Sequence, residues 1–305
     1  MMTFRKICSH LLVLCVLCFI SKPSGLCREH TKAVKKINII TSVYPLKEFA
    51  QAVFGKKAEV KMLIPPGAEV HTWKPKPSDI LRFSKADLFV YIGASMEPWL
   101  DDIIESTGRR DLILIEAVKG FHLIKEQQNR FDPHVWLEFE YDQQIVDKII
   151  QTASSMQPEN KMYFEQNGKE YKNKLKDLDE LYQNTLTCCE VRSFIIGGHS
   201  AFGYLARRYN LIQISVHGLS PDSTPSPKHI KEIIEMAKQN HIDIIYYQEY
   251  VNDQIARMLA DEINAQTMRL NPGANLSENQ IRSNLTFIEV MKKNLENLKY
   301  GLRCK

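Results

Sequence analysis

Residues 158–187 read PENKMYFEQNGKEYKNKLKDLDELYQNTLT, and this stretch decides how the chain is organised. It is polar and poor in strand formers, and Pro158 suits the first turn of a helix. Its apolar residues recur at helical intervals and form one narrow stripe: Tyr171, Leu175, Leu178 and Tyr182. A long helix with so narrow an apolar face is typical of a connector lying against two larger parts. The pattern therefore predicts a connecting helix over residues 157–188.

The sequence on both sides of this helix alternates between strand and helix patterns. Before it, aliphatic and β-branched runs predict strands at 37–43, 58–64, 87–92 and 111–115, and helices at 77–86 and 98–106. After it, strands are predicted at 192–196, 211–216 and 242–247. Helices are predicted over 201–208, around Ile230, Ile233, Ile234 and Ala237, around Ile255, Met258, Leu259 and Ile263, and over 283–302. Such alternation predicts parallel sheets covered on both faces.

The expected fold class is therefore α/β, with two parallel-sheet (β/α) lobes joined by one long rigid α-helix. The expected boundaries are 27–156 for the N-terminal lobe, 157–188 for the connecting helix and 189–305 for the C-terminal lobe. In open α/β sheets, ligands bind beyond the carboxyl ends of the strands. Two facing lobes thus predict a binding site in the cleft between them.

Residues 1–26 have the pattern of a signal peptide. Arg5 and Lys6 form a positive start, and Leu11–Ile20 is a run of ten apolar residues, too short to span a bilayer. We therefore expect an exported, periplasmic protein. An uncleaved anchor helix is one alternative. Lipidation of Cys27 is another, although Leu26 stands where lipoprotein signals carry a small residue.

The composition excludes several classes of function. The 305 residues are 44% hydrophobic and 25% charged, the balance of a folded soluble protein. The formal charge of +4 falls to +1 without Arg5, Lys6 and Lys22 of the leader. A nearly neutral chain has no electrostatic basis for binding nucleic acid. Separately, we expect the protein to be a monomer.

Four cysteines lie beyond the leader: Cys27, Cys188, Cys189 and Cys304. Export to an oxidising compartment permits a disulfide. The adjacent Cys188 and Cys189 lack the two further thiolates that a tetrahedral metal site would need. We expect one of the two to pair with Cys304. The sequence leaves open which one, and a free buried thiol is the alternative.

Three of the nine histidines stand beside residues that stiffen the chain. His71 follows the second predicted strand in Gly67-Ala68-Glu69-Val70-His71, His134 lies in Asp132-Pro133-His134, and His199 follows Gly197-Gly198 at a strand end. A single histidine is usually a hydrogen-bonded surface or core residue. Three neutral imidazoles that face one cleft are a typical zinc set, with the fourth position left to water or a carboxylate.

The chain resembles the metal-binding solute-binding proteins of ABC transporters, of the ZnuA/TroA type, over about residues 38–302. The resemblance rests on segments that occur in this order: Thr41-Ser42-Val43-Tyr44-Pro45-Leu46, Pro66-Gly67-Ala68-Glu69-Val70-His71 with Pro77-Ser78-Asp79, Gly93-Ala94-Ser95-Met96-Glu97-Pro98-Trp99-Leu100, Asp132-Pro133-His134-Val135-Trp136-Leu137, His199-Ser200-Ala201-Phe202-Gly203-Tyr204 and Asn294-Leu295-Glu296-Asn297-Leu298. Each piece is weak alone, but the set in this order and spacing is highly specific.

The resemblance implies that His71, His134 and His199 bind the metal, the first two from the N-terminal lobe side and His199 from the C-terminal lobe. Manganese-type members usually carry glutamate at the position of His199, so an imidazole there favours zinc. The fourth carboxylate of the family falls on Asn271, a poor zinc ligand, which leaves water or Glu249 as candidates. Asp132 is expected to orient an imidazole.

The function implied is that of an exported, high-affinity zinc-binding protein that captures Zn²⁺ and delivers it to an ABC permease in the membrane. The alternatives are a manganese-type member of the family, a surface adhesin on the same fold, and a zinc enzyme. No Gly-x4-Gly-Lys-Ser/Thr loop and no His-Glu-x-x-His motif occur in the sequence, so we expect neither nucleotide hydrolysis nor enzyme activity.

Overall fold

The computed structural model describes residues 36–126, 130–219, 225–249 and 252–305, which belong to one compact unit that begins at Lys36. The predicted signal peptide and Cys27 lie outside the described residues. Within those residues, no helix combines the length and the apolar character needed to cross a membrane.

The first sheet has four parallel strands in the order β2-β1-β3-β4. They are β1 (Ile37–Thr41), β2 (Ala58–Met62), β3 (Leu88–Tyr91) and β4 (Ile113–Glu116). The helices beside them are α1 (Tyr44–Phe54), which ends in a 3-10 turn at Gly55–Lys57, α2 (Pro77–Phe83) and α3 (Leu100–Thr107). The neighbouring residues Ile39 and Ile40 enter different hydrophobic clusters, one with α1 and the other with α2 and α3. Both faces of the sheet are therefore buried.

The second sheet repeats this arrangement, in the order β6-β5-β7-β8 with all strands parallel. Its strands are β5 (Ser193–Ile196), β6 (Ile212–Ser215), β7 (Ile244–Tyr247) and β8 (Gln266–Arg269). Its helices are α6 (Gly203–Arg208), α7 (Pro227–Gln239), α8 (Gln254–Ile263), α9 (Glu278–Arg282) and α10 (Phe287–Gly301). The predicted fold class, α/β with two parallel sheets, is confirmed.

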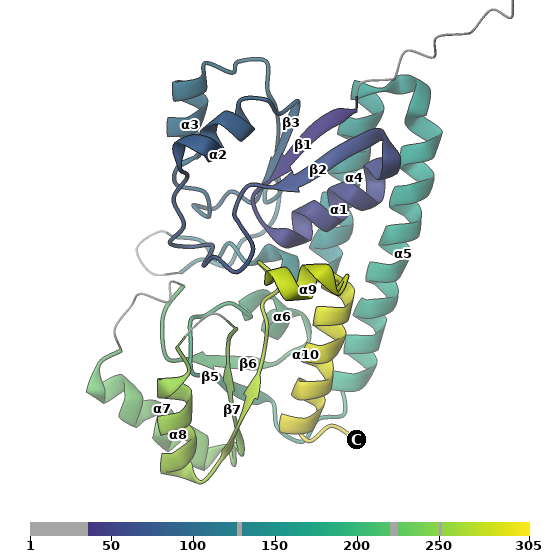
Figure 1. Cartoon of the computed structure of the whole chain (residues 1–305). Helices are drawn as coiled ribbons and strands as arrows, with labels where there is room; N and C mark the ends of the chain where they lie inside the picture. Colours follow the sequence, from purple (N-terminus) through teal and green to yellow (C-terminus); the bar gives the residue numbers. More distant parts are fainter. Residues whose placement is uncertain (1–35, 127–129, 220–224, 250–251) are drawn as a thin grey trace, which may run out of the picture. The chain divides into compact units, whose positions relative to one another are not determined.

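A pair of long helices, α4 (Phe139–Met156) and α5 (Lys161–Leu186), follows the first sheet (Figure 1). We call the first sheet with α1–α4 the N-terminal lobe, and the second sheet with α6–α10 the C-terminal lobe. The predicted stripe of α5 is buried, and α5 bonds to both lobes: Tyr171 Oη donates to Glu48 of α1, and Tyr182 Oη donates to the carbonyl of Met291 in α10. Gly168 lets α4 approach closely, because a Cβ there would lie 2.2 Å from Cδ1 of Ile150.

Several details differ from the sequence-based expectations. The long helix begins at Lys161 after a 3-10 turn at Pro158–Asn160, and the closing helix begins at Phe287 rather than at 283. Thr286 caps that helix, since its Oγ1 accepts from Glu289 N and Glu289 bonds back to Thr286 N. The helix predicted around Ile255, Met258, Leu259 and Ile263 is α8, in which Met258 is exposed. The predicted lobe boundaries stay predictions.

The disulfide joins Cys189 to Cys304, and Cys188 is a free, exposed thiol. This settles which of the two adjacent cysteines pairs with Cys304. The same residues form an isolated antiparallel β-bridge, so the C-terminus is fixed beside the segment that follows α5.

Candidate metal centre

Three loops bring the histidines together. His71 lies in the loop between β2 and α2, His134 immediately precedes the 3-10 turn Val135–Leu137 that leads into α4, and His199 follows β5. Loops that follow parallel strands meet at one edge of a sheet. The structure thus places side by side three residues that are widely separated in the sequence.

The three imidazoles converge through their ring nitrogens. Nε2 of His134 lies 3.1 Å from Nε2 of His71 and 3.4 Å from Nε2 of His199. One nitrogen of each ring falls within a group whose members are all within 4.8 Å of one another. Zinc binds imidazole nitrogen at about 2.0–2.1 Å, so two such ligands of a tetrahedral ion lie about 3.3 Å apart. The donor set and its spacing therefore fit one zinc ion.

The cavity at this point is small and lies among residues of both lobes. Its volume of about 20 Å³ is lined by the three histidines together with Ala68, Glu69, Val70, Glu249, Asn271, Pro272, Ala274 and Asn275. A space of this size accommodates a single ion or water molecule. The cavity between the three imidazoles can therefore hold one metal ion.

His134 is oriented by Asp132, as predicted for that carboxylate. Oδ1 of Asp132 lies 2.7 Å from Nδ1 of His134 and also accepts the backbone N–H of His134 at 2.9 Å. Both side chains are buried. A carboxylate only accepts, so Nδ1 carries the proton and the lone pair of Nε2 is directed at the cluster.

His199 is held through its main chain. Gln248, which directly follows β7, accepts from His199 N and donates to His199 O, each at 3.0 Å. Gly198 permits this approach, since a Cβ there would lie 2.5 Å from the Gln248 side chain. Nδ1 of His199 is buried without a hydrogen-bond partner among the described residues. The sequence analysis missed Gln248 and considered only its neighbour Glu249.

Burial favours the neutral form of two of the three rings. Desolvation, together with the nearby His134, lowers the pKa of His71 to about 3. Desolvation, then His134 and His71, holds the pKa of His199 well below its usual range. Both rings are therefore neutral near pH 7, and neutral imidazole is the form that binds metal.

The two protein candidates for a fourth ligand are engaged elsewhere. Glu249 accepts from Nδ2 of Asn271 at 2.5 Å and from Nε2 of Gln280 at 3.1 Å. Oδ1 of Asn271 in turn accepts the N–H of Gly273 at 2.7 Å. Glu249 does not belong to the group of described His, Cys, Asp and Glu residues that could hold a metal ion. These bonds favour a structural role for both residues.

A two-lobed α/β protein with clustered imidazoles where its lobes meet defines the class of metal-binding solute-binding proteins. Residues 39–301 match the family described as the zinc-uptake complex component A, periplasmic. The chain belongs to that family, which confirms the resemblance drawn from its motifs.

Individual relatives agree with this assignment. The chain is 37% identical over 284 residues to the high-affinity zinc uptake system protein ZnuA of Bacillus subtilis (strain 168), a match that covers 88% of this chain and 89% of that protein. It is 34% identical to the zinc-binding lipoprotein AdcA of Streptococcus pneumoniae (strain ATCC BAA-255 / R6) over 97% of this chain but 60% of AdcA. The solved structure of the Zn(II)-bound ZnuA-like domain of S. pneumoniae AdcA is similar with a TM-score of 0.77 and 35% identity, over 88% of this chain and 99% of that chain.

Proposed function

We propose that this protein captures Zn²⁺ with His71, His134 and His199 and carries it as cargo to a zinc-uptake complex. The observation that carries the proposal is the convergence of three Nε2 atoms, with 3.1 Å and 3.4 Å between neighbours. Three neutral nitrogen donors suit zinc better than manganese, which prefers oxygen ligands. Water takes the fourth position.

We propose that the partner is an ABC permease in the membrane and that the protein acts as a monomer without enzyme activity. The family is described as a component of a zinc-uptake complex, periplasmic, which supports an exported location. The family is named for zinc uptake, which supports transport rather than catalysis. A free periplasmic protein is favoured over one anchored through Cys27, and membrane fractionation distinguishes the two.

Metal content and competitive zinc titration of the mature protein test this function. We expect one zinc per chain in the wild type, and binding that is lost or greatly weakened in His199→Ala. The matched control is His122→Ala, because His122 is exposed and lies outside the cluster. Stoichiometric manganese with weak zinc binding would place the protein with the manganese-type members. No bound metal would refute the proposal.

A further inference from the structure

Residues 271–287, here called the strap, follow β8 of the C-terminal lobe but bond along much of their length to the N-terminal lobe. At the metal site, Nε1 of Trp136 donates to Pro272 O at 2.7 Å. Tyr44 N, at the start of α1, donates to Ala274 O at 2.8 Å. These bonds join main-chain atoms of the strap to the N-terminal lobe close to the cluster.

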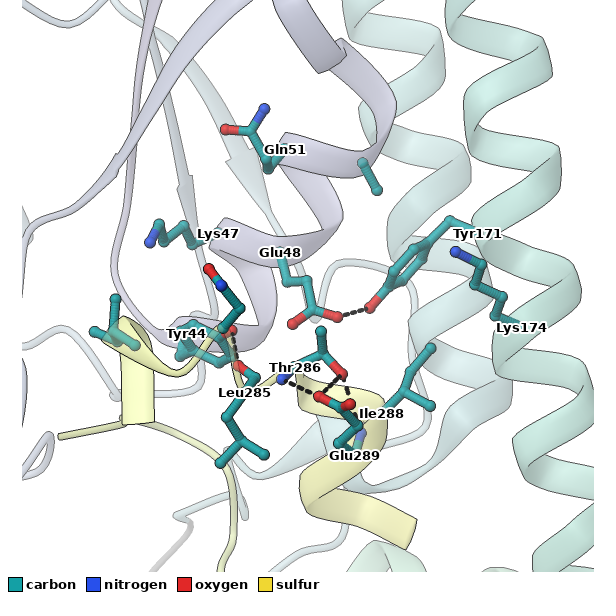
Figure 2. A pocket seen from close by; sticks show the side chains of 13 residues that line it. Tyr44, Lys47, Glu48, Gln51, Tyr171, Lys174, Leu285, Thr286, Ile288 and Glu289 are labelled. Atoms are coloured by element: carbon teal, nitrogen blue, oxygen red, sulfur yellow. Dashed lines mark hydrogen bonds between the residues drawn. The ribbon is translucent and has the colours of Figure 1, made fainter. Parts of the chain in front are cut away.

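The other end of the strap is fixed to α1 as well. Figure 2 shows Oη of Tyr44 directed at Leu285, whose carbonyl it reaches at 2.8 Å. The same view shows Glu48 directed at Tyr171 of α5. The second oxygen of Glu48 accepts the N–H of Phe287, the first residue of α10, at 2.6 Å. The strap is thus bonded to the N-terminal lobe at both ends.

Between these ends, Asn275 contacts the loop that carries His71. Its Nδ2 donates to Pro65 O and to Ala68 O, both at 2.8 Å. Its Oδ1 accepts from Leu276 N at 2.8 Å, which fixes the orientation of the amide. The side chain is 4% exposed, so water cannot replace these bonds without local opening. Leu276 O accepts a third bond from the same loop, from Gly67 N at 3.0 Å.

The loop also has contacts that do not involve the strap. Within the loop, Glu69 accepts from His71 N, and Ala68 N donates to Pro65 O. These bonds shape a turn within the loop. Beyond His71, the ring of Trp73 packs edge-on against Trp99, with 5.3 Å between centroids. His71 is also the least buried of the three histidines. The strap thus supplies three of the hydrogen bonds that hold the middle of the loop.

We propose that Asn275 is a positioning residue of the zinc site: an amide of the C-terminal lobe that holds the His71 loop in the geometry needed to bind the ion. The inference rests on the proposed function, because it takes His71 to be a ligand.

The test uses three variants of the mature protein. Asn275→Ala removes both donors to the loop, and Asn275→Ser retains one short donor and disturbs packing less. Asn279→Ala is the matched control, because Asn279 is exposed on α9 in the same strap. Zinc affinity is measured by competitive titration, and the visible spectrum of bound Co²⁺ reports the geometry and nitrogen ligation of the site. Each substitution at Asn275 is repeated in the His71→Ala background.

We expect Asn275→Ala to weaken zinc binding by about 10- to 100-fold, the range typical of residues that orient metal ligands, with Asn275→Ser intermediate and Asn279→Ala unchanged. We also expect an altered Co²⁺ spectrum and no further loss when Asn275→Ala is added to His71→Ala. The proposal is overturned if Asn275→Ala binds zinc within twofold of the wild type, or if it weakens the His71→Ala protein by the same factor. A His71→Ala protein that binds zinc like the wild type would instead refute the proposed function.

Discussion

Asp142 of α4 lies fully buried close enough to Glu48 of α1 for the two carboxylates to repel, and neither oxygen of Asp142 has a hydrogen-bond partner among the described residues. Burial, then the charges of Glu138 and Glu48, hold the pKa of Asp142 well above its usual range. Tyr171 of α5 donates to the carboxylate of Glu48. The pKa of Tyr171 is itself raised by burial and by the charges of Glu48 and Asp142.

Asp142→Asn is expected to stabilise the metal-free protein at alkaline pH. The raised pKa means that the folded chain holds this proton where the unfolded chain has released it, so stability falls as pH rises from about 4 through the folded-state pKa. One such proton contributes up to about 1.4 kcal/mol per pH unit. Urea unfolding at pH 5 and pH 8 should show a shallower decline in the variant. The exposed Asp261→Asn should keep the wild-type slope, and equal slopes in all three proteins would contradict the expectation.

Removal of Asp132 should weaken zinc binding. Asp132→Ala leaves Nδ1 of the buried His134 without its acceptor and frees the ring to turn, so we expect about 10- to 100-fold lower affinity. Asp132→Asn keeps the shape and should lose less. The check is competitive zinc titration, with Asp261→Asn as the surface control. Unchanged affinity in Asp132→Ala would show that the carboxylate does not orient the ligand.

Removal of Gln248, which holds the main chain of His199, should also weaken zinc binding. Gln248→Ala removes both bonds to the main chain of His199, and Gln248→Glu keeps the acceptor for His199 N but loses the donor to His199 O. We expect about tenfold weaker zinc binding for alanine and a smaller loss for glutamate. Gln239→Ala, at the exposed end of α7, should bind as the wild type does. An equal affinity in all four proteins would argue against this role.

The disulfide should stabilise the fold considerably. Cys189 and Cys304 are 115 residues apart, and a closed loop of this length restricts the unfolded chain strongly. Replacing both by serine is expected to lower the free energy of unfolding by about 2–4 kcal/mol. Cys188→Ser leaves the bridge intact and should unfold like the wild type under oxidising conditions. Denaturant titration decides the point, and similar midpoints for the two variants would count against the bridge as a stabilising element.

Local sequence patterns predict much of this fold because strands and amphipathic helices have periods that can be read directly. Of the elements that were missed, one strand lacks such a pattern. β8 reads Gln-Thr-Met-Arg, a partly exposed edge strand without an aliphatic run. α1 begins with Tyr44-Pro45, which was considered only as part of a motif after the first strand. α4 was also missed, although its buried face carries Ile145 and Ile149.

The histidines could be selected from the sequence because each follows a strand or a stiffening residue near the predicted cleft. Gln248 and Asn275 could not be selected in this way. Their partners are 49 and 207 residues away in the chain, respectively, and an amide that bonds to distant main-chain atoms leaves no local pattern. The role of Asp132 could be predicted from the sequence only because its partner, His134, is two residues away.

The strap also has a consequence for the order in which the protein matures. A chain emerges from the ribosome and crosses the membrane from its N-terminus, so the loop with His71 appears long before Asn275, whose bond to Ala68 spans 207 residues. The first lobe can form its sheet early but gains its anchor for that loop only when the last tenth of the chain arrives. Under the proposed role of Asn275, a chain that is still being exported lacks this anchor, and zinc is taken up by the finished protein.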